Sequence, residues 1–341
     1  MRMKRLWLGI LLIAMAAGIL LISDWNQRVA PVTASTAAPP IGKTWKVRVI
    51  QLNNSAEVEE TEHGLRQGLL EAKLVEGRDY EMKIGNAQAD MATLSTLMDS
   101  ALSERADLIV AFSTPTLQVA LRKVERTPVV YTYVGLGVTA GVGPSREDHR
   151  VNVTGVDVIS AYQEMVDLIG THFPHWRRVG TLYSPAEINM VVQKELIEES
   201  FRKAGIELIS VPVNTSTEVA DAALALTAKG LDAIVQIPGN LTAISFGAIL
   251  KAAVKAKLAA FAFTGPQAMA GAPVSLARDY EESGRLAAQM VARIMRGADP
   301  KNIPIEQVMG ATLYVNRTGA RAANLQIPPA LLKRADRVIG D

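Results

Sequence analysis

The chain contains no cysteine among its 341 residues. Disulfide bonds, thiolate nucleophiles and cysteine-ligated zinc or iron–sulfur centres are therefore excluded, as is lipid attachment at an N-terminal cysteine. An excess of charge of one sign is also lacking, because 36 Lys and Arg face 34 Asp and Glu. Residues 1–43 carry five of the positive charges and one of the negative ones, so the remainder has a net charge of −2. Without a long basic run, we expect no nucleic-acid partner.

Common catalytic motifs are missing too. The sequence has no G-x-S-x-G nucleophile elbow, no H-E-x-x-H zinc pattern and no G-x-x-x-x-G-K-[ST] phosphate loop. His172 and His175 are close in sequence, but the helix-breaking Pro174 lies between them and no third ligand is near. Basic residues at the end of a helix are the simpler interpretation. We therefore expect neither an enzyme nor a metal site.

The segment Gly135–Gly143 is rich in glycine, a feature that it shares with dinucleotide-binding turns. A dinucleotide-binding turn belongs after the first strand of its sheet and opens a helix. This segment follows the fourth expected strand and runs into Pro144. A flexible crossover between two lobes explains the glycines more simply, so no cofactor is expected.

The N-terminal segment, residues 1–43, has the composition of a membrane-targeting segment. Three basic residues precede the uncharged, mostly apolar run Leu6–Ile22, which as a helix spans roughly 25 Å, near the short limit for a bilayer. No small-x-small pair follows directly, which favours an uncleaved signal anchor over a signal peptide cut near residues 35–38. The Pro- and Ala-rich stretch Ala30–Pro40 then forms a linker. We expect a periplasmic or extracytoplasmic protein tethered to the cytoplasmic (inner) membrane by this helix.

The body alternates apolar, β-branched runs with helical patterns. Near-continuous apolar strands between amphipathic helices are typical of a parallel sheet covered on both faces, which predicts an α/β fold with doubly wound sheets. The expected strands are 46–52, 79–85, 107–112, 128–133, 177–183, 206–213, 231–237 and 259–263. The expected helices are 57–76, 90–105, 115–126, 160–172, 187–204, 216–229 and 241–257.

The two halves of the body resemble each other. The strand at Asp107 aligns with that at Asp232, and the strand at Pro128 with that at Ala260, at nearly constant spacing. We expect a first α/β lobe at 44–157 plus roughly 279–310. The second lobe is expected at 158–278 plus roughly 311–341. Because parallel sheets bind ligands beyond the carboxyl ends of their strands, two facing lobes predict a ligand cleft between them.

Small polar residues collect where the expected strands end. They are candidates both for capping the following helices and for binding a ligand, and the two roles are compatible. From the first half they are Asn53, Ser55, Ser113, Thr114, Thr132 and Tyr133, and from the second half Ser184, Glu187, Asn189, Asn240 and Thr264. If the halves are related, Ser113 and Thr114 should face Gly239 and Asn240 across the cleft.

Four segments are distinctive in combination: Val179-Gly-Thr-Leu-Tyr-Ser-Pro-Ala-Glu-Ile-Asn-Met, Asn152-Val-Thr-Gly-Val, Arg278-Asp-Tyr-Glu-Glu-Ser-Gly and Leu313-Tyr-Val-Asn-Arg-Thr-Gly-Ala. Together they resemble segments of the tryptophan/tyrosine-type ABC-transporter substrate-binding proteins. The resemblance covers roughly residues 44–330 and implies a type I periplasmic-binding-protein fold that takes up small ligands, often amino acids. It also suggests Asp279 as a partner for a ligand amino group, although Asp279 and Glu282 resemble a capping box as well.

The expected function is that of an extracytoplasmic solute-binding protein. It would capture a small polar or amino-acid-like ligand between its lobes and hand it to an ABC permease, with a monomeric body. A membrane-anchored sensing module with a membrane partner is the alternative, and an enzyme on the same scaffold is less favoured.

Overall fold

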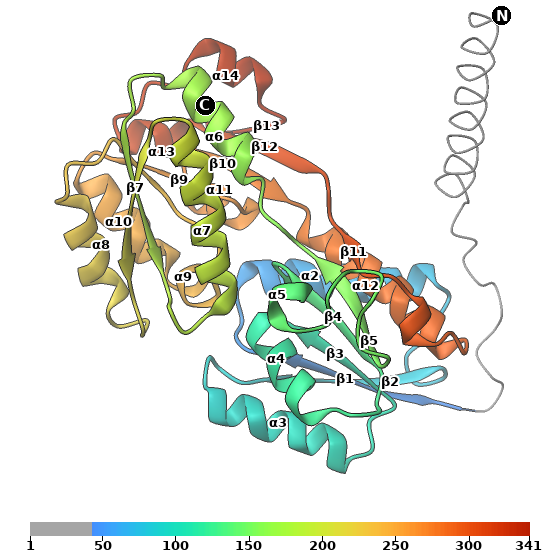
Figure 1. The fold of residues 1–341 in the computed structure, drawn as a ribbon. Helices are drawn as coiled ribbons and strands as arrows, with labels where there is room; N and C mark the ends of the chain where they lie inside the picture. Colours follow the sequence, from blue (N-terminus) through green and yellow to red (C-terminus); the bar gives the residue numbers. More distant parts are fainter. Residues whose placement is uncertain (1–42) are drawn as a thin grey trace, which may run out of the picture. The chain divides into compact units, whose positions relative to one another are not determined.

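The computed structural model describes residues 43–341, which form two α/β lobes (Figure 1). The expected anchor Leu6–Ile22 lies outside the described residues. Within 43–341, no helix is both long enough and apolar enough to span a membrane.

The first lobe is built on a six-stranded, wholly parallel sheet with the order β11-β5-β4-β3-β1-β2. Its core strands are buried throughout, as in the β3 sequence LIVAF, because helices cover both faces. Helices α2 and α12 pack on one face, and α3 and α4 on the other. The strands are β1 (Trp45–Gln51), β2 (Tyr80–Asn86), β3 (Leu108–Phe112), β4 (Val129–Val134), β5 (Val153–Asp157) and β11 (Glu306–Gln307). The helices are α2 (Ala56–Glu71), α3 (Met91–Ser103), α4 (Thr114–Lys123), α5 (Gly137–Ala140), α12 (Tyr280–Met295) and the 3₁₀ turn η1 (Pro300–Asn302).

The second lobe has a four-stranded parallel sheet, β7-β6-β8-β9, and a three-stranded sheet, β10-β12-β13. A bridge between Ala262 and Ser275 links the two sheets, and β10 pairs with β12 in the antiparallel direction. The strands are β6 (Arg178–Tyr183), β7 (Glu207–Pro212), β8 (Ala233–Val235), β9 (Ala259–Phe261), β10 (Val274–Arg278), β12 (Ala311–Asn316) and β13 (Arg337–Ile339). The helices are α6 (Tyr162–His172), α7 (Ile188–Lys203), α8 (Val219–Thr227), α9 (Asn240–Ile244), α10 (Phe246–Lys255), α11 (Gly265–Ala270), α13 (Arg317–Ala322) and α14 (Pro329–Arg334).

The eight strands expected from the sequence are confirmed, with ends shifted by a few residues. Strands β5, β10, β11, β12 and β13 were not expected, and neither were helices α5, α11, α12, α13 and α14. The helix expected at 241–257 is divided into α9 and α10 at Ser245. The antiparallel β10–β12 pair also departs from the all-parallel expectation, because β12 enters its sheet from the first lobe, opposite in direction to β10.

Three crossovers join the lobes, at residues 158–161, at Asp279 and at 308–310. The glycine-rich segment Gly135–Gly143 is not one of them, so that expectation was wrong. It belongs to the first lobe, where the amide of Gly137 donates to Asp157 Oδ1 at 2.8 Å. A Cβ atom on Gly137 would lie 2.1 Å from the Tyr131 hydroxyl. Gly137 therefore serves close packing and not flexibility.

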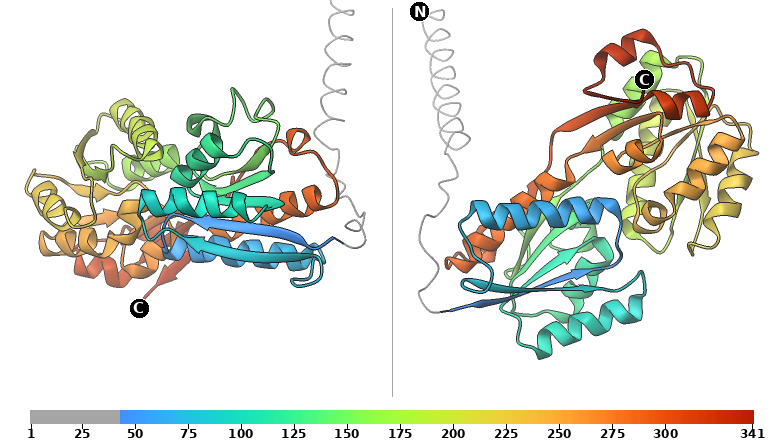
Figure 2. Two further views of the ribbon diagram at one scale, coloured as in Figure 1. Left: turned by 90° about the horizontal axis from the view of Figure 1, so that it is seen from below. Right: turned by 180° about the vertical axis from the view of Figure 1, so that it is seen from behind.

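Helices α2 and α12 approach each other through glycine (Figure 2). A Cβ atom on Gly64 would lie 1.9 Å from the carbonyl oxygen of Glu281, and one on Gly284 would lie 2.0 Å from that of Thr61. Because α12 continues directly from β10 through Asp279, this backbone contact fixes where the chain from the second lobe enters the first.

Gly64→Ala and Gly284→Ala are each expected to lower the free energy of unfolding by about 1–3 kcal/mol, because the new methyl group forces the helix backbones apart. The control is Gly247→Ala on α10, where a Cβ atom meets nothing within 4 Å. This change should instead stabilise by about 0.5–1 kcal/mol, the helix propensity difference between the two residues. Urea unfolding measures all three, and equal stability of Gly64→Ala and Gly247→Ala would contradict the packing argument.

Candidate functional site

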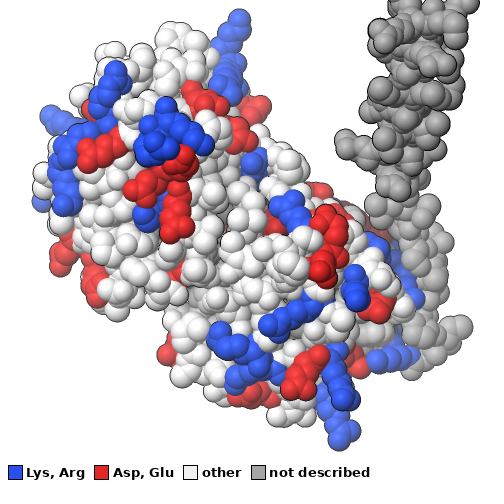
Figure 3. Space-filling view, viewed as in Figure 1, with Lys and Arg blue, Asp and Glu red and all other residues white. Residues whose placement is uncertain are grey.

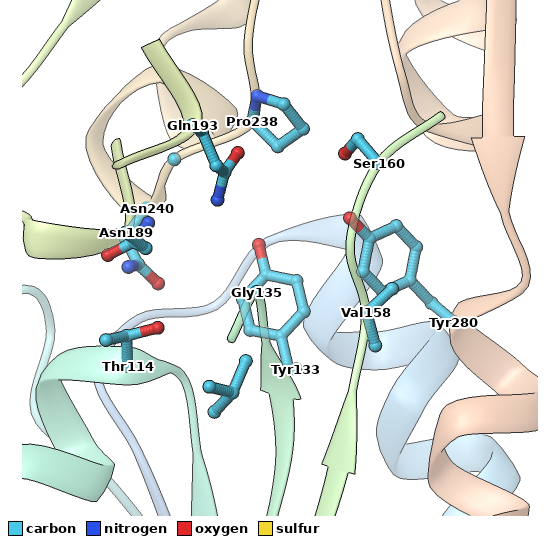
Figure 4. Close-up of a pocket in the computed structure, with 12 residues that line it drawn as sticks. Thr114, Tyr133, Gly135, Val158, Ser160, Asn189, Gln193, Pro238, Asn240 and Tyr280 are labelled. Atoms are coloured by element: carbon cyan, nitrogen blue, oxygen red, sulfur yellow. The ribbon is translucent and has the colours of Figure 1, made fainter. Parts of the chain in front are cut away.

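A pocket lies where the strand ends of the two lobes meet (Figure 4). The first lobe and the first crossover contribute Thr114, Tyr133, Val134, Gly135, Val158 and Ser160, and the rest of the lining is Asn189, Gln193, Pro238, Gly239, Asn240 and Tyr280. Thr114, Gly239 and Asn240 line it together, as expected, whereas Ser113 lies outside the lining. Four of the predicted ligand residues line this pocket, namely Thr114, Tyr133, Asn189 and Asn240.

Strained backbone occurs at the pocket wall and next to it. The pocket residue Tyr133, near the end of β4, has φ 57°, and Ser113, which follows β3 and precedes the pocket residue Thr114, has φ 85°; both values lie in the region that favours glycine. The pairing of β4 with β5 changes register between Tyr131 and Val134, and Tyr133 lies inside this irregularity. Such strain costs about 1–3 kcal/mol per residue and is typical of functional sites. Here it brings the Tyr133 side chain to the pocket wall.

Two tyrosines form one wall of the pocket. The rings of Tyr133 and Tyr280 lie 5.4 Å apart at an interplanar angle of 59°. Burial, aided by the negative charge of Glu57, raises the pKa of both phenols. Both hydroxyl groups therefore remain protonated and able to donate hydrogen bonds.

Glu187 lies outside the pocket lining and binds the residues that form the side opposite the tyrosines. Its buried carboxylate accepts hydrogen bonds from the Asn240 amide (2.9 Å), the Leu241 amide (3.0 Å) and Asn240 Nδ2 (2.7 Å). Asn189 Nδ2 adds a longer contact of 3.4 Å. The carboxylate thus caps α9 from another element and orients two asparagine side chains. Glu187 was predicted as a ligand residue, but its oxygens are occupied by protein donors.

Three asparagine side chains near the junction of the lobes, those of Asn53, Asn189 and Asn240, have a buried carbonyl oxygen without a protein partner. Asn53 Nδ2 donates to the main-chain oxygen of Asn240 at 3.2 Å, while Asn189 and Asn240 donate to Glu187. Because each amide nitrogen has an acceptor, the orientation of each amide is determined. The three Oδ1 atoms are buried and have no hydrogen-bond partner among residues 43–341. Asn189 and Asn240 line the pocket and offer these acceptors to a ligand that can donate, whereas Asn53 lies outside the lining.

The two lobes are closed against each other. Besides the Asn53–Asn240 bond, Thr264 Oγ1 of the second lobe donates to Glu57 Oε1 of α2 at 2.7 Å. The pocket volume is about 30 Å³, which is room for one or two water molecules. A ligand of several heavy atoms therefore enters only when the lobes separate.

The pocket lining has no formal charge at neutral pH. None of its twelve residues is an Asp, Glu, Lys, Arg or His. On the face shown in Figure 3, charged side chains of both signs are interspersed over the outer parts of the lobes. Because burying a net charge without a counter-charge is costly, this lining suits a ligand whose own charges sum to zero.

The other predicted site residues lie outside the lining. Ser55 caps α2 through the amide of Val58, and Thr264 caps α11 through that of Gln267. Thr132 is buried beneath α12, with its hydroxyl 2.7 Å from that of Ser283. Ser113 and Ser184 are buried; the Ser113 hydroxyl is bonded to Thr116 Oγ1, and the main-chain amide of Ser184 donates to Met190 Sδ.

Sequence reasoning missed several lining residues. Tyr280 directly follows Asp279 in the quoted Arg278-Asp-Tyr segment, and Gln193 lies one helical turn after Asn189, so helix periodicity could have found it. Ser160 had no signal, since the end of β5 was not recognised.

Asp279 is exposed and caps α12, with its Oδ1 accepting from the Glu282 amide at 2.8 Å. It lines a second, polar cavity of about 230 Å³ at the lobe junction, together with Glu60, Glu281 and Tyr314. There, partial burial and the nearby negative charges of Glu57, Asp279 and Glu281 raise the pKa of Glu60 to about 7.

This shift has a defined effect on stability. The folded protein holds the Glu60 proton more tightly than the unfolded chain, so the stabilisation is complete below the ordinary pKa of 4.5 and is lost as pH rises through about 7. Glu60→Gln should therefore raise the melting temperature relative to the parent at pH 8 but not at pH 4. Melting curves over this range test it, with Glu59→Gln, an exposed neighbour on the same helix, as control. A Glu60→Gln difference that does not change with pH would contradict the assignment.

Comparison with known proteins gives a consistent result. The family model for ABC transporter substrate-binding proteins matches residues 46–339. A tyrosine-binding protein of Clostridioides difficile (strain R20291) is 24% identical over 317 residues, covering 93% of this chain and 92% of that protein.

Two solved structures share the fold over 87% of this chain and their own full length. A conserved domain protein from Vibrio cholerae O1 biovar El Tor is 30% identical with a TM-score of 0.83. The ABC domain in complex with L-Trp from Streptococcus pneumonia is 24% identical, also with a TM-score of 0.83. These relatives confirm the fold expected from the sequence. The chain belongs to the family of ABC transporter substrate-binding proteins.

Proposed function

We propose that this protein captures a zwitterionic amino acid between its lobes and delivers it to an ABC importer. The observation that carries the proposal is the pair of oriented asparagine carbonyls, those of Asn189 and Asn240, in an uncharged pocket between the lobes. A buried acceptor without a donor costs roughly 1–3 kcal/mol, so a ligand that supplies donors gains that amount on binding.

The ligand's ammonium group is assigned to the carbonyls of Asn189 and Asn240, which line the pocket. Their buried environment favours a group with several donors, and an ammonium has three. The charge of Glu187 supports this assignment indirectly, through the asparagine side chains. Its carboxylate accepts from the amide groups of Asn189 and Asn240, and this polarises their carbonyls towards the ligand.

The ligand's carboxylate is assigned to the start of α4, where Thr114 lines the pocket. The first turn of a ten-residue helix presents main-chain amides and the positive end of the helix dipole. The tyrosine pair Tyr133 and Tyr280 then lies beside the remaining part of the ligand. An aromatic or apolar side chain fits that wall, in line with the L-Trp complex and the tyrosine-binding relative.

A set of ligand analogues tests this assignment. Thermal-shift and calorimetric titration should detect L-tyrosine or L-tryptophan, and at about 100 times Kd a ligand stabilises by roughly 2.7 kcal/mol. Tyramine lacks the carboxylate and 3-(4-hydroxyphenyl)propionate lacks the ammonium. Each should bind about ten- to a hundredfold more weakly than L-tyrosine. Equal affinity for the propionate would overturn the role of the asparagines.

Asn240→Ala and Thr114→Ala should weaken binding to a similar extent. The matched control is Asn316→Ala, since Asn316 is equally buried but both ends of its amide are bonded within the second lobe. This control should lose about 1 kcal/mol of stability as a helix cap and keep its affinity. Unchanged affinity in both pocket variants would place the site elsewhere.

The proposal includes the tether at residues 6–22 and an extracytoplasmic location. It is supported by the basic start and apolar length of that segment. Mass spectrometry of the membrane fraction should find these residues still attached, and a mature N-terminus near residues 35–38 would show cleavage and release instead.

A further inference from the structure

Arg278, the last residue of β10, lies at the junction of the three crossovers. Its guanidinium is almost buried, with 9% of the side chain exposed. Nε donates to the main-chain oxygen of Ile159 at 2.8 Å, and Nη1 donates to that of Met309. Ile159 belongs to the first crossover and Met309 to the third, while Arg278 itself begins the second. One side chain thus connects all three.

The contacts of Arg278 lie just beyond the point where the backbone hydrogen bonds between β5 and β11 end. Strands β5 and β11 leave the first lobe side by side, and their last backbone bond runs from the Val308 amide to the Asp157 oxygen at 3.0 Å. Beyond it, Ile159 and Met309 are held together by the guanidinium. On the other side, the backbone of Arg278 is paired with Ala311 at the start of β12. Glu164 on α6, 3.5 Å from Nη2, provides a partial counter-charge.

The same segments form part of the pocket wall. Val158 and Ser160 flank Ile159, and Tyr280 lies two residues after Arg278; all three line the pocket. The spacing of the crossovers therefore also sets the spacing of this wall. Arg278 itself does not line the pocket.

We propose that Arg278 is the positioning residue of the hinge, because its guanidinium holds the three crossovers at one spacing so that the lobes move about a single axis. It acts on the ligand only through Val158, Ser160 and Tyr280. Planar, forked donors suit two carbonyl oxygens on separate strands, whereas a lysine ammonium is a single point of charge on a flexible stem. The effect on binding, but not that on lobe geometry, rests on the proposed function.

The second lobe offers a matched control. Arg178 also holds two main-chain oxygens, those of Lys229 at 2.8 Å and Gly230 at 3.0 Å, and pairs with Glu207 at 3.0 Å. All of these partners lie inside one lobe. Arg178→Lys thus removes the same kind of clamp without touching a crossover.

The test measures the distance between two spin labels, one on each lobe of the full-length chain, by pulsed electron–electron double resonance. Because the chain has no cysteine, spin labels can be placed by Thr96→Cys on α3 and Ala225→Cys on α8, both exposed. Arg278→Lys should broaden the distance distribution between the lobes without ligand, and Arg178→Lys should leave it unchanged. With L-tryptophan or L-tyrosine as probe, Arg278→Lys should bind about three- to thirtyfold more weakly than the parent.

A melting temperature measured in parallel separates positioning from a purely structural role. If Arg278→Lys lowers the melting temperature but leaves the distance distribution as narrow as in the parent, the proposal is overturned. If Arg278→Lys does not fold, Arg278→Gln, which retains one amide group as donor, is used in the same measurements. If neither amino acid narrows the parent's distribution, the proposed ligand class fails, while the comparison without ligand still decides the role of Arg278.

Discussion

The buried carboxylate of Glu187 is the interaction on which the site depends. It has no cationic partner within the described chain and is satisfied instead by N–H groups of α9 and of two asparagines. An ion buried in this way is tolerable only when such donors surround it. Because the side-chain donors of Asn189 and Asn240 are used by Glu187, these two pocket-lining residues keep their carbonyl oxygens as free acceptors. A carboxylate that does not itself line the pocket thus determines its hydrogen-bonding character.

Two polar contacts join the lobes in the closed arrangement. Asn53 with Asn240 and Glu57 with Thr264 join residues far apart in sequence, and each bond involves a group at a strand end or helix start. Net hydrogen-bond energies are about 1 kcal/mol each, so such contacts define a closed geometry while remaining easy to break. The glycine contact between α2 and α12, in contrast, is made by backbone and keeps the first lobe rigid as the hinge moves. Rigid lobes that are held closed only by weak contacts can open and close around a ligand by hinge motion.

The sequence predicted the fold well where elements repeat regularly. Runs such as Leu108–Phe112 are apolar on both faces, and this is the property of a strand covered by helices on both sides. The short strands β11 and β13, at two and three residues, have too few positions to show a period. Thr114 and Asn240 line the pocket because parallel strands end at one edge. Glu187 and Thr132 follow the same rule in sequence, yet their side chains are committed to contacts within the protein.

The sequence by itself determined the α/β class, the duplication of the body, the edges at which polar residues gather and the family. Each of these follows from local periodicity or from short segments, which are readable without knowing the partners of a side chain. Tertiary structure decided which polar groups remain without a partner, that Gly135–Gly143 packs inside a lobe, and that Arg278 joins three crossovers. These properties arise from pairs of residues separated by tens to hundreds of positions, such as Asn53 with Asn240. No local pattern records such a pair, because its bond exists only once both lobes have folded and met.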